Sequence, residues 1–214
     1  TVDNGISSVA GVQATKQIGS QVLITDHHLA PETLPEADAI VNPNQQGCSF
    51  KSKAIAGVGV IFYVMLALRG RLRELGRFES GLSEPNMAAL LDLIALGTIA
   101  DVVPLDHNNR ILVAEGLRRI RAGKARPGIQ ALLQVAGKNT AALTASDLAF
   151  GVGPRLNAAG RLDDMTTGIE CLLSEHADTA YQLALQLDSM NQDRKQIEAD
   201  MRQQAFESLA EFEF

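Results

Sequence analysis

The stretch that decides the fold runs from Gln21 to His28 and reads QVLITDHH. Its first five residues form a short apolar run, which is typical of a strand buried in a parallel sheet. The last three are polar residues of the kind that bind metals. In an open α/β sheet, ligands collect beyond the carboxyl ends of the strands. The stretch therefore predicts both a parallel sheet and a site at its edge.

The residues on either side of this stretch predict an order of strand, helix and strand. We expect a strand at Thr1-Val2, a helix over 9–18 and a third strand over 39–41. The first two strands would lie parallel, because a helix connects them. Asp3 and Asp26 would then be the first residues beyond two strand ends on the same edge of the sheet.

Helices are expected over most of the remaining chain. Apolar spacing predicts them over residues 54–75, 86–99, 109–122, 129–135 and 145–150, followed by a glycine-rich turn over 153–161 and one long amphipathic helix from 174 to the end. The expected fold class is α/β, with a parallel sheet flanked by helices, then further helices and a long connecting helix. A hydrophobic content of 46% is enough for a core of this kind.

The charge of the chain bears on nucleic-acid binding. A net charge of −6 argues against binding through the whole surface, because such binding needs clustered Lys and Arg. The basic residues are concentrated between His107 and Arg126, where Glu115 is the one acidic residue. This basic run predicts either a local binding surface or a solvated helix face, and charge alone does not separate the two.

Cysteine usage and hydropathy bear on the compartment. Cys48 and Cys171 match no metal or redox spacing, which is typical of free thiols in a reducing compartment, so a cytoplasmic protein is expected. No stretch is long and apolar enough for a membrane span, and no basic-then-apolar leader occurs.

Asp3, the Asp26-His27-His28 triplet and Asp101 are the candidate catalytic and metal-binding residues. Imidazole nitrogen and carboxylate oxygen together suit Mn²⁺, Zn²⁺ or Fe²⁺ better than Mg²⁺ or Ca²⁺. Successive residues leaving a strand point in different directions, so one histidine is expected to bind an ion and the other a substrate.

Each of these motifs alone has an ordinary explanation. Asp3-Asn4-Gly5 consists of turn formers, and paired histidines are often satisfied by hydrogen bonds. Asp101 follows an apolar helix, and a carboxylate in apolar surroundings is unfavourable unless it is paired or metal-bound. The prediction depends on the joint occurrence of the three motifs.

The order of the motifs resembles the DHH phosphoesterase superfamily. The segments that carry the resemblance are Val2-Asp3-Asn4-Gly5, Thr25-Asp26-His27-His28 and residues 97–104 (GTIADVVP). Residues 42–44 (NPN), 56–60 (AGVGV) and 153–161 (GPRLNAAGR) narrow it to the RecJ family of bacterial exonucleases. The resemblance covers essentially the whole chain.

The resemblance implies a 5′-to-3′ exonuclease that acts on single-stranded DNA in repair and recombination with two Mn²⁺ or Mg²⁺ ions. Asp3 would bridge the two ions, and His27 and Asp101 would be ligands of one of them. His28 would contact the scissile phosphate, and Asp26 would support the site from nearby. The partners implied are single-stranded DNA with a 5′ end, with a single-strand-binding protein and a helicase as candidates, and no membrane.

Three further residues are predicted to bind the DNA. Arg155, Asn157 and Arg161 lie in the glycine-rich tract, and an Arg beside backbone amides can grip a phosphate bidentately. The alternative is a helix connector in which these Arg residues pair with Asp163 or Asp164.

The sequence also departs from the family pattern. The family's first acidic motif, of the type Asp-x-Asp-x-Asp, and its second lobe are not found in these residues. We therefore interpret the chain as an internal fragment and expect it to be inactive by itself. Residues 1–174 would form the DHH catalytic domain without its N-terminal strands, and residues 175–214 a connecting helix toward the second lobe.

Other functions remain open at this point. The same motifs occur in oligoribonucleases, nucleotide phosphatases and manganese pyrophosphatases of the superfamily, and a non-catalytic DNA-binding relative is a further alternative. The basic run and the GPRLNAAGR tract favour the DNA exonuclease. The presence of all five candidate catalytic residues argues against the non-catalytic relative.

Overall fold

The computed structural model describes residues 4–79, 81–162 and 164–210, without the side chains of Arg161, Leu162 and Ala210. The chain divides into two compact units, residues 1–116 and 117–214. Each unit has its own buried core, and the boundary falls inside helix α4 (His107–Arg121).

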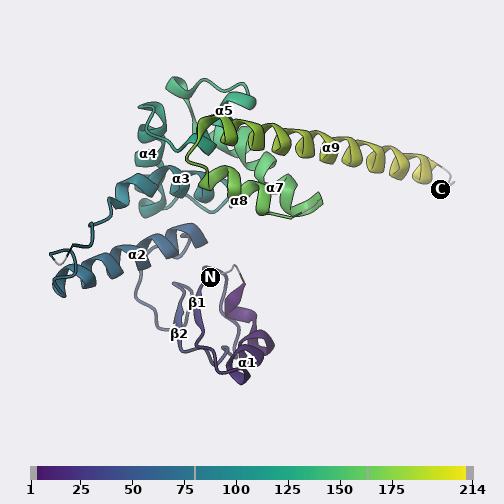
Figure 1. Ribbon diagram of the computed structural model, residues 1–214. Coiled ribbons are helices and arrows are strands. Elements are labelled where there is room, and N and C mark those ends of the chain that lie inside the picture. The colour runs from purple at the N-terminus through teal and green to yellow at the C-terminus, as the bar shows by residue number, and fades with distance from the viewer. Residues whose placement is uncertain (1–3, 80, 163, 211–214) are drawn as a thin grey trace. The chain divides into compact units, whose positions relative to one another are not determined.

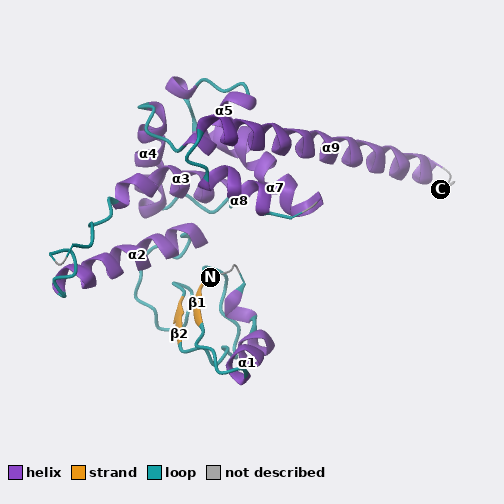
Figure 2. Cartoon of the chain, in the orientation of Figure 1, coloured by secondary structure: helices purple, strands orange, loops and turns teal. Residues whose placement is uncertain are grey.

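The first unit begins with the elements that surround the QVLITDHH stretch. They are the 3-10 helix η1 (Gly5–Ser7), helix α1 (Val9–Gln17) and strands β1 (Leu23–Thr25) and β2 (Ala39–Val41), as Figure 2 shows. The two strands pair in parallel, with Leu23 opposite Ala39 and Thr25 opposite Val41. Both strands and the helix between residues 9 and 18 were predicted and are confirmed. The expected strand at Thr1-Val2 lies outside the described residues.

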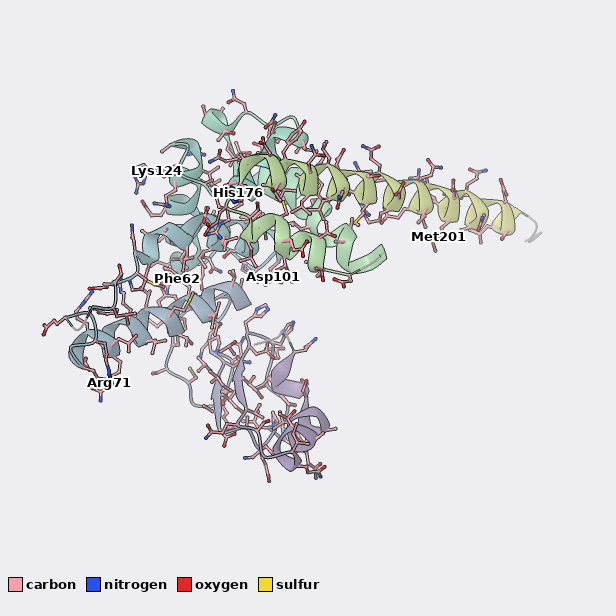
Figure 3. All side chains as sticks on the ribbon, viewed as in Figure 1. Phe62, Arg71, Asp101, Lys124, His176 and Met201 are labelled. Carbon is pink, nitrogen blue, oxygen red and sulfur yellow. The ribbon has the colours of Figure 1, made fainter. Side chains whose placement is uncertain are left out.

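Helices complete the first unit. They are α2 (Gly57–Glu74), the 3-10 helix η2 (Met87–Leu90) and α3 (Leu91–Ala100). Phe62 of α2, labelled in Figure 3, is buried in a cluster whose other members are Ile55, Val60, Met87, Ile94 and Leu112. Helix α2 also contacts α3 and β1. This packing brings the end of α3 and the end of β1 into one unit.

The regular elements described in the second unit are all helices (Figure 1). Its elements are α5 (Pro127–Val135), η3 (Thr140–Ala142), α6 (Ala145–Asp147), the π-helix η4 (Leu148–Val152), α7 (Gly153–Leu162), α8 (Thr166–Leu173) and α9 (Ala177–Ala210). Helices α5, α7 and α8 pack against α9, where Ala180, Ala184 and Leu187 are fully buried. The long C-terminal helix was predicted and is confirmed.

The prediction of a glycine-rich turn over 153–161 is wrong, because these residues form helix α7. Helices α6, η4 and α7 run on without a break, so Pro154 lies inside a helical run, directly after the π-helix, and not at a free helix start. Leu156, Ala158 and Ala159 are buried, so tertiary packing outweighs the low helix propensity of the tract's glycines. Helix α8 was not predicted. It packs close to α7, because a Cβ added at Gly168 would lie 3.5 Å from the side chain of Leu156.

The α/β fold class is confirmed, with a small parallel sheet and a majority of helices. None of the helices in the described part of the chain is both long and apolar enough to cross a membrane.

Candidate metal centre

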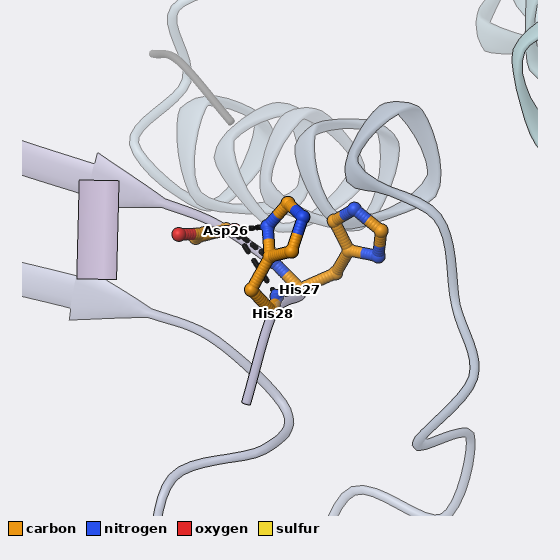
Figure 4. Close-up of side chains that lie close together, drawn as sticks. All are labelled: Asp26, His27 and His28. Atoms are coloured by element: carbon orange, nitrogen blue, oxygen red, sulfur yellow. Dashed lines mark hydrogen bonds and ion pairs between the residues drawn. The ribbon is translucent and has the colours of Figure 1, made fainter. Parts of the chain in front are cut away.

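Asp26, at the carboxyl end of β1, organises the local structure of the centre. Its side chain is fully buried, and its Oδ2 accepts the backbone N–H of Ile6 at 2.8 Å. Its Oδ1 accepts the backbone N–H groups of His27 at 2.7 Å and His28 at 3.1 Å, drawn as dashed lines in Figure 4. Both oxygens are therefore engaged with protein donors, and Asp26 acts as a support for the turn.

The charge of Asp26 follows from these contacts. Burial raises the pKa of the carboxyl group, but the hydrogen bonds from Ile6, the His28 ring and the backbone of His28 and His27 lower it. The net pKa lies below the ordinary value of 3.8. Asp26 is thus a carboxylate at neutral pH, although it is buried.

His28 is oriented by the same carboxylate. Its Nδ1 lies 2.8 Å from Asp26 Oδ1. Because an ionised carboxylate only accepts hydrogen bonds, Nδ1 carries a proton and donates it. The Nε2 atom, on the other side of the ring, is then the nitrogen that can act toward a ligand or a phosphate.

His27 lies beside Asp101. Asp101, which Figure 3 labels, is the residue that follows helix α3. The distance from His27 Nε2 to Asp101 Oδ2 is 3.4 Å. Two ligands bound at about 2.1 Å and at right angles around one ion would lie about 3 Å apart, so the pair has suitable spacing for a shared ion. The two histidine rings are tilted by 52°, with centroids 4.5 Å apart.

Two sets of donor atoms thus compete as the candidate ligand group. Donor atoms of Asp26, His27 and His28 lie within 4.8 Å of one another. The oxygens of Asp26 already accept four hydrogen bonds, however, while the His27 and Asp101 side chains approach each other directly. The pair of His27 and Asp101 is therefore the better ligand set, and one imidazole with one carboxylate fits Mn²⁺.

The expectation that Asp101 lies in a buried apolar setting is wrong. Its side chain is 35% exposed, because the carboxylate lies just past the last turn of α3. The buried carboxylate of this helix is Asp92, which is 1% exposed and accepts the backbone N–H of Leu93. An ion at Asp101 would therefore be accessible from solvent.

Sequence reasoning missed the contribution of Asn42 and Asn44, which follow β2. Asn42 Nδ2 donates to the backbone oxygen of His28 at 3.0 Å, and Asn44 Nδ2 donates to that of His27 at 2.6 Å. Asn42 Oδ1 also accepts the backbone N–H of Asn44 at 2.8 Å. Their position directly after a parallel strand, at the same edge as Asp26, was the pattern that could have identified them.

The other predicted site residues are Asp3, Arg155, Asn157 and Arg161. Asp3 lies outside the described residues. In the second unit, Arg155 on α7 forms an ion pair of 2.7 Å with Asp188 on α9 and donates to the oxygen of Gly151. Asn157 is exposed on α7, and Arg161 belongs to the same helix without a described side chain. The roles of all these residues stay predictions.

Comparison with known proteins relates this geometry to one family. Residues 1–98 match the model of the DHH family, N-terminal domain. All 214 residues align at 60% identity with the single-stranded-DNA-specific exonuclease RecJ of Dickeya dadantii (strain 3937), of which they cover 37%. The chain therefore spans about a third of the length of this curated relative.

Solved structures show the same similarity. The crystal structure of exonuclease RecJ bound to manganese matches 95% of this chain and 49% of that chain, with a TM-score of 0.80 and 36% identity. The crystal structure of RecJ from Thermus thermophilus in complex with Mg²⁺ matches 94% of this chain and 31% of that chain, with a TM-score of 0.66 and 29% identity.

Proposed function

Because residues 1–98 belong to the DHH family and the whole chain aligns with RecJ exonucleases, we propose that it is part of a metal-dependent exonuclease for single-stranded DNA. The main observation behind the proposal is that His27 Nε2 lies 3.4 Å from Asp101 Oδ2, close to the end of β1. These two residues come from distant parts of the sequence. Their donor set is the kind that Mn²⁺ binds, and Mg²⁺ is the other ion of the related structures.

The residues of the proposed metal centre would have different roles. Asp3, His27 and Asp101 would hold the ions, with Asp3 as the bridging carboxylate. The bound ions would activate a water molecule and stabilise charge on the attacked phosphate. Asp26 fixes the protonated Nδ1 of His28, so that Nε2 of His28 can contact the scissile phosphate. Asn42 and Asn44 hold the backbone that carries both histidines.

The wider role is proposed from the same relationship. The substrate would be a single strand with a free 5′ end, degraded during DNA repair and recombination in the cytoplasm, with a single-strand-binding protein and a helicase as partners. Arg155, Asn157 and Arg161 remain the proposed DNA-binding residues, although Arg155 already pairs with Asp188.

The domain organisation is proposed as a DHH domain over residues 1–174 and a connecting helix over 175–214. The exposed apolar side chains of Met201, Phe206 and Leu209 support a connecting role for the end of α9, whereas Ala180, Ala184 and Leu187 near its start are buried in the second unit. Exposed apolar side chains favour packing against a further part of a longer protein.

The test is nuclease activity of the longer protein that contains this chain, assayed with 5′-phosphorylated single strands and Mn²⁺. His27→Ala and Asp101→Ala should each lower the rate at least about tenfold and weaken Mn²⁺ binding, because each removes a ligand. His176→Ala, at an exposed position just before α9, is the matched control and should have no effect. Full activity of both ligand variants would contradict the proposal.

The isolated 214-residue chain should be inactive in the same assay. Dinucleotides and pyrophosphate serve as competing substrates. Faster hydrolysis of either one than of long single strands would assign the protein to another branch of the superfamily.

A further inference from the structure

The loop that follows Asp101 is held by contacts other than the burial of its own side chains. None of the residues 101–106 is buried. Val102 has a φ of 58°, a left-handed conformation that a β-branched residue keeps only where its surroundings impose it. Because Asp101 is a proposed metal ligand, the contacts that impose this path also bear on where its carboxylate lies.

Asn109, in the first turn of α4, fixes the far end of this loop. Its side chain is fully buried. Its Nδ2 donates to the backbone oxygen of Ala54 at 2.9 Å and to that of Pro104 at 2.9 Å. Both N–H groups of the amide are therefore used, one on the loop after Asp101 and the other on the segment that leads into α2.

A second contact joins the same two parts of the chain. The buried Ser52 hydroxyl donates to Asp106 Oδ2 at 2.6 Å. Asp106 Oδ1 in turn accepts the backbone N–H of Asn109 at 3.0 Å. The loop after Asp101 is thus bonded at two points to residues 52–54, which we call the bridging segment.

The bridging segment is also bonded to the turn that carries His27. Asn44 Nδ2 donates to the backbone oxygen of Lys53 at 3.2 Å and to that of His27 at 2.6 Å. Asn44 therefore does for the His27 turn what Asn109 does for the loop after Asp101. The backbone on either side of the centre is connected through three consecutive residues, so the separation of the two proposed ligands depends on this segment.

The stability of the core alone does not explain an asparagine at this position. Asn109 Oδ1 is buried and finds no donor among the residues that the structure describes. A buried polar atom without a partner lowers stability. What the amide supplies is two directed hydrogen bonds, which fix Ala54 and Pro104 relative to each other.

We propose that Asn109 is a positioning residue for the metal centre: by joining the bridging segment to the loop after Asp101, it keeps the Asp101 carboxylate beside His27. The inference rests on the proposed function, which supplies the metal centre. Two ligands that are already 3.4 Å apart bind an ion without the entropic cost of first ordering a loop. Ser52 contributes to the same positioning through Asp106.

The experiment measures Mn²⁺ binding by calorimetry in the longer protein that contains this chain. Asn109→Ala should weaken binding roughly tenfold, because it releases the loop that carries a ligand. In an Asp101→Ala background the same change should have little further effect, since the ligand that it positions is gone. A merely structural role would weaken binding by the same factor in both backgrounds.

Leu112→Ala is the matched control. Leu112 lies three residues further along α4 and is buried in the core of the first unit. The variant should lower the urea midpoint, as Asn109→Ala does, but should bind Mn²⁺ like the wild type. This result would show that lost stability does not by itself weaken the centre.

Ser52→Ala removes a single hydrogen bond and should weaken Mn²⁺ binding about threefold in the wild type and little in the Asp101→Ala background. It replaces Asn109→Ala in the test if that variant does not fold. Unchanged binding in the folded variants, or equal losses in both backgrounds, would overturn the inference and leave the proposed function intact. Wild-type binding by Asp101→Ala itself would contradict the proposed metal centre as well.

Discussion

At the scale of the single residue, the geometry of the centre depends on Asp26. Both oxygens of Asp26 accept backbone N–H groups. In Asp26→Asn, an N–H₂ group replaces one of these oxygens, so that a donor faces a donor. A buried donor without an acceptor destabilises a protein by about 1–3 kcal/mol. We expect a lower urea midpoint and weaker Mn²⁺ binding. Asp193→Asn, which removes a charge at an exposed position of α9, should change neither property.

Val102, directly after Asp101, is held in an unusual backbone conformation. Its φ is 58° and its side chain is 84% exposed, so packing does not compensate for the strain of a β-branched residue in the left-handed region. Val102→Asn should raise the free energy of unfolding by about 0.5–1 kcal/mol, because Asn adopts this conformation readily. Val9→Asn, in helix α1, should lower it. A lower free energy of unfolding in both variants, measured by urea denaturation, would contradict this explanation.

At the scale of the element, helix α6 is capped reciprocally by Thr144 and Asp147. Hydrogen bonds from the Thr144 side chain and backbone, then from Lys138, lower the pKa of Asp147 to about 2. A depressed folded-state pKa stabilises the protein above the ordinary value of 3.8, and this contribution is lost as the pH falls toward 2.

Thr144→Ala should therefore move the pKa of Asp147 up toward its ordinary value, as NMR titration of the carboxyl carbon would show. The stability difference between this variant and wild type should shrink as the pH falls from the ordinary value of 3.8 to about 2. Thr179→Ala, at an exposed position on α9, is the control. A difference that stays constant over this range would contradict the role of the carboxylate.

The packing of α5 on α8 requires a glycine. A Cβ at Gly128 would lie 2.0 Å from the backbone oxygen of Cys171, so Gly128→Ala should destabilise the protein by roughly 1–3 kcal/mol. Gly70→Ala is the matched control, since nothing lies within 4 Å of its added Cβ. Within helix α2, that change should stabilise by about 1 kcal/mol. The melting temperature should therefore fall for Gly128→Ala and rise for Gly70→Ala.

At the scale of the whole molecule, the two units have separate cores. Residues 105–214, which keep α4 intact, should fold without the rest of the chain. Leu132, Leu133, Leu148 and Leu187 bury their side chains within the second unit and supply its core. Circular dichroism of this piece should show high helix content and a cooperative melt. A non-cooperative transition would mean that the second unit needs the first one.

Local sequence was sufficient for much of this architecture. The apolar run before Asp26 predicted β1, and the periodicity of the C-terminal residues predicted α9, because both patterns depend on neighbours along the chain. The same reasoning failed at α7, where glycine and proline suggested a turn. There the burial of Leu156, Ala158 and Ala159 decided the conformation.

The Asp26-His27-His28 triplet marked the candidate centre from the sequence, since the residues after a buried parallel strand must lie at the sheet edge. The three-dimensional structure was needed to show that Asp101 approaches His27 and that Asn42 and Asn44 hold the histidine backbone. It was also needed to show that Arg155 pairs with Asp188 and that Asn109 joins Ala54 to Pro104. These contacts join separate elements, and their distances depend on how the helices and strands pack, which no local pattern of residues specifies.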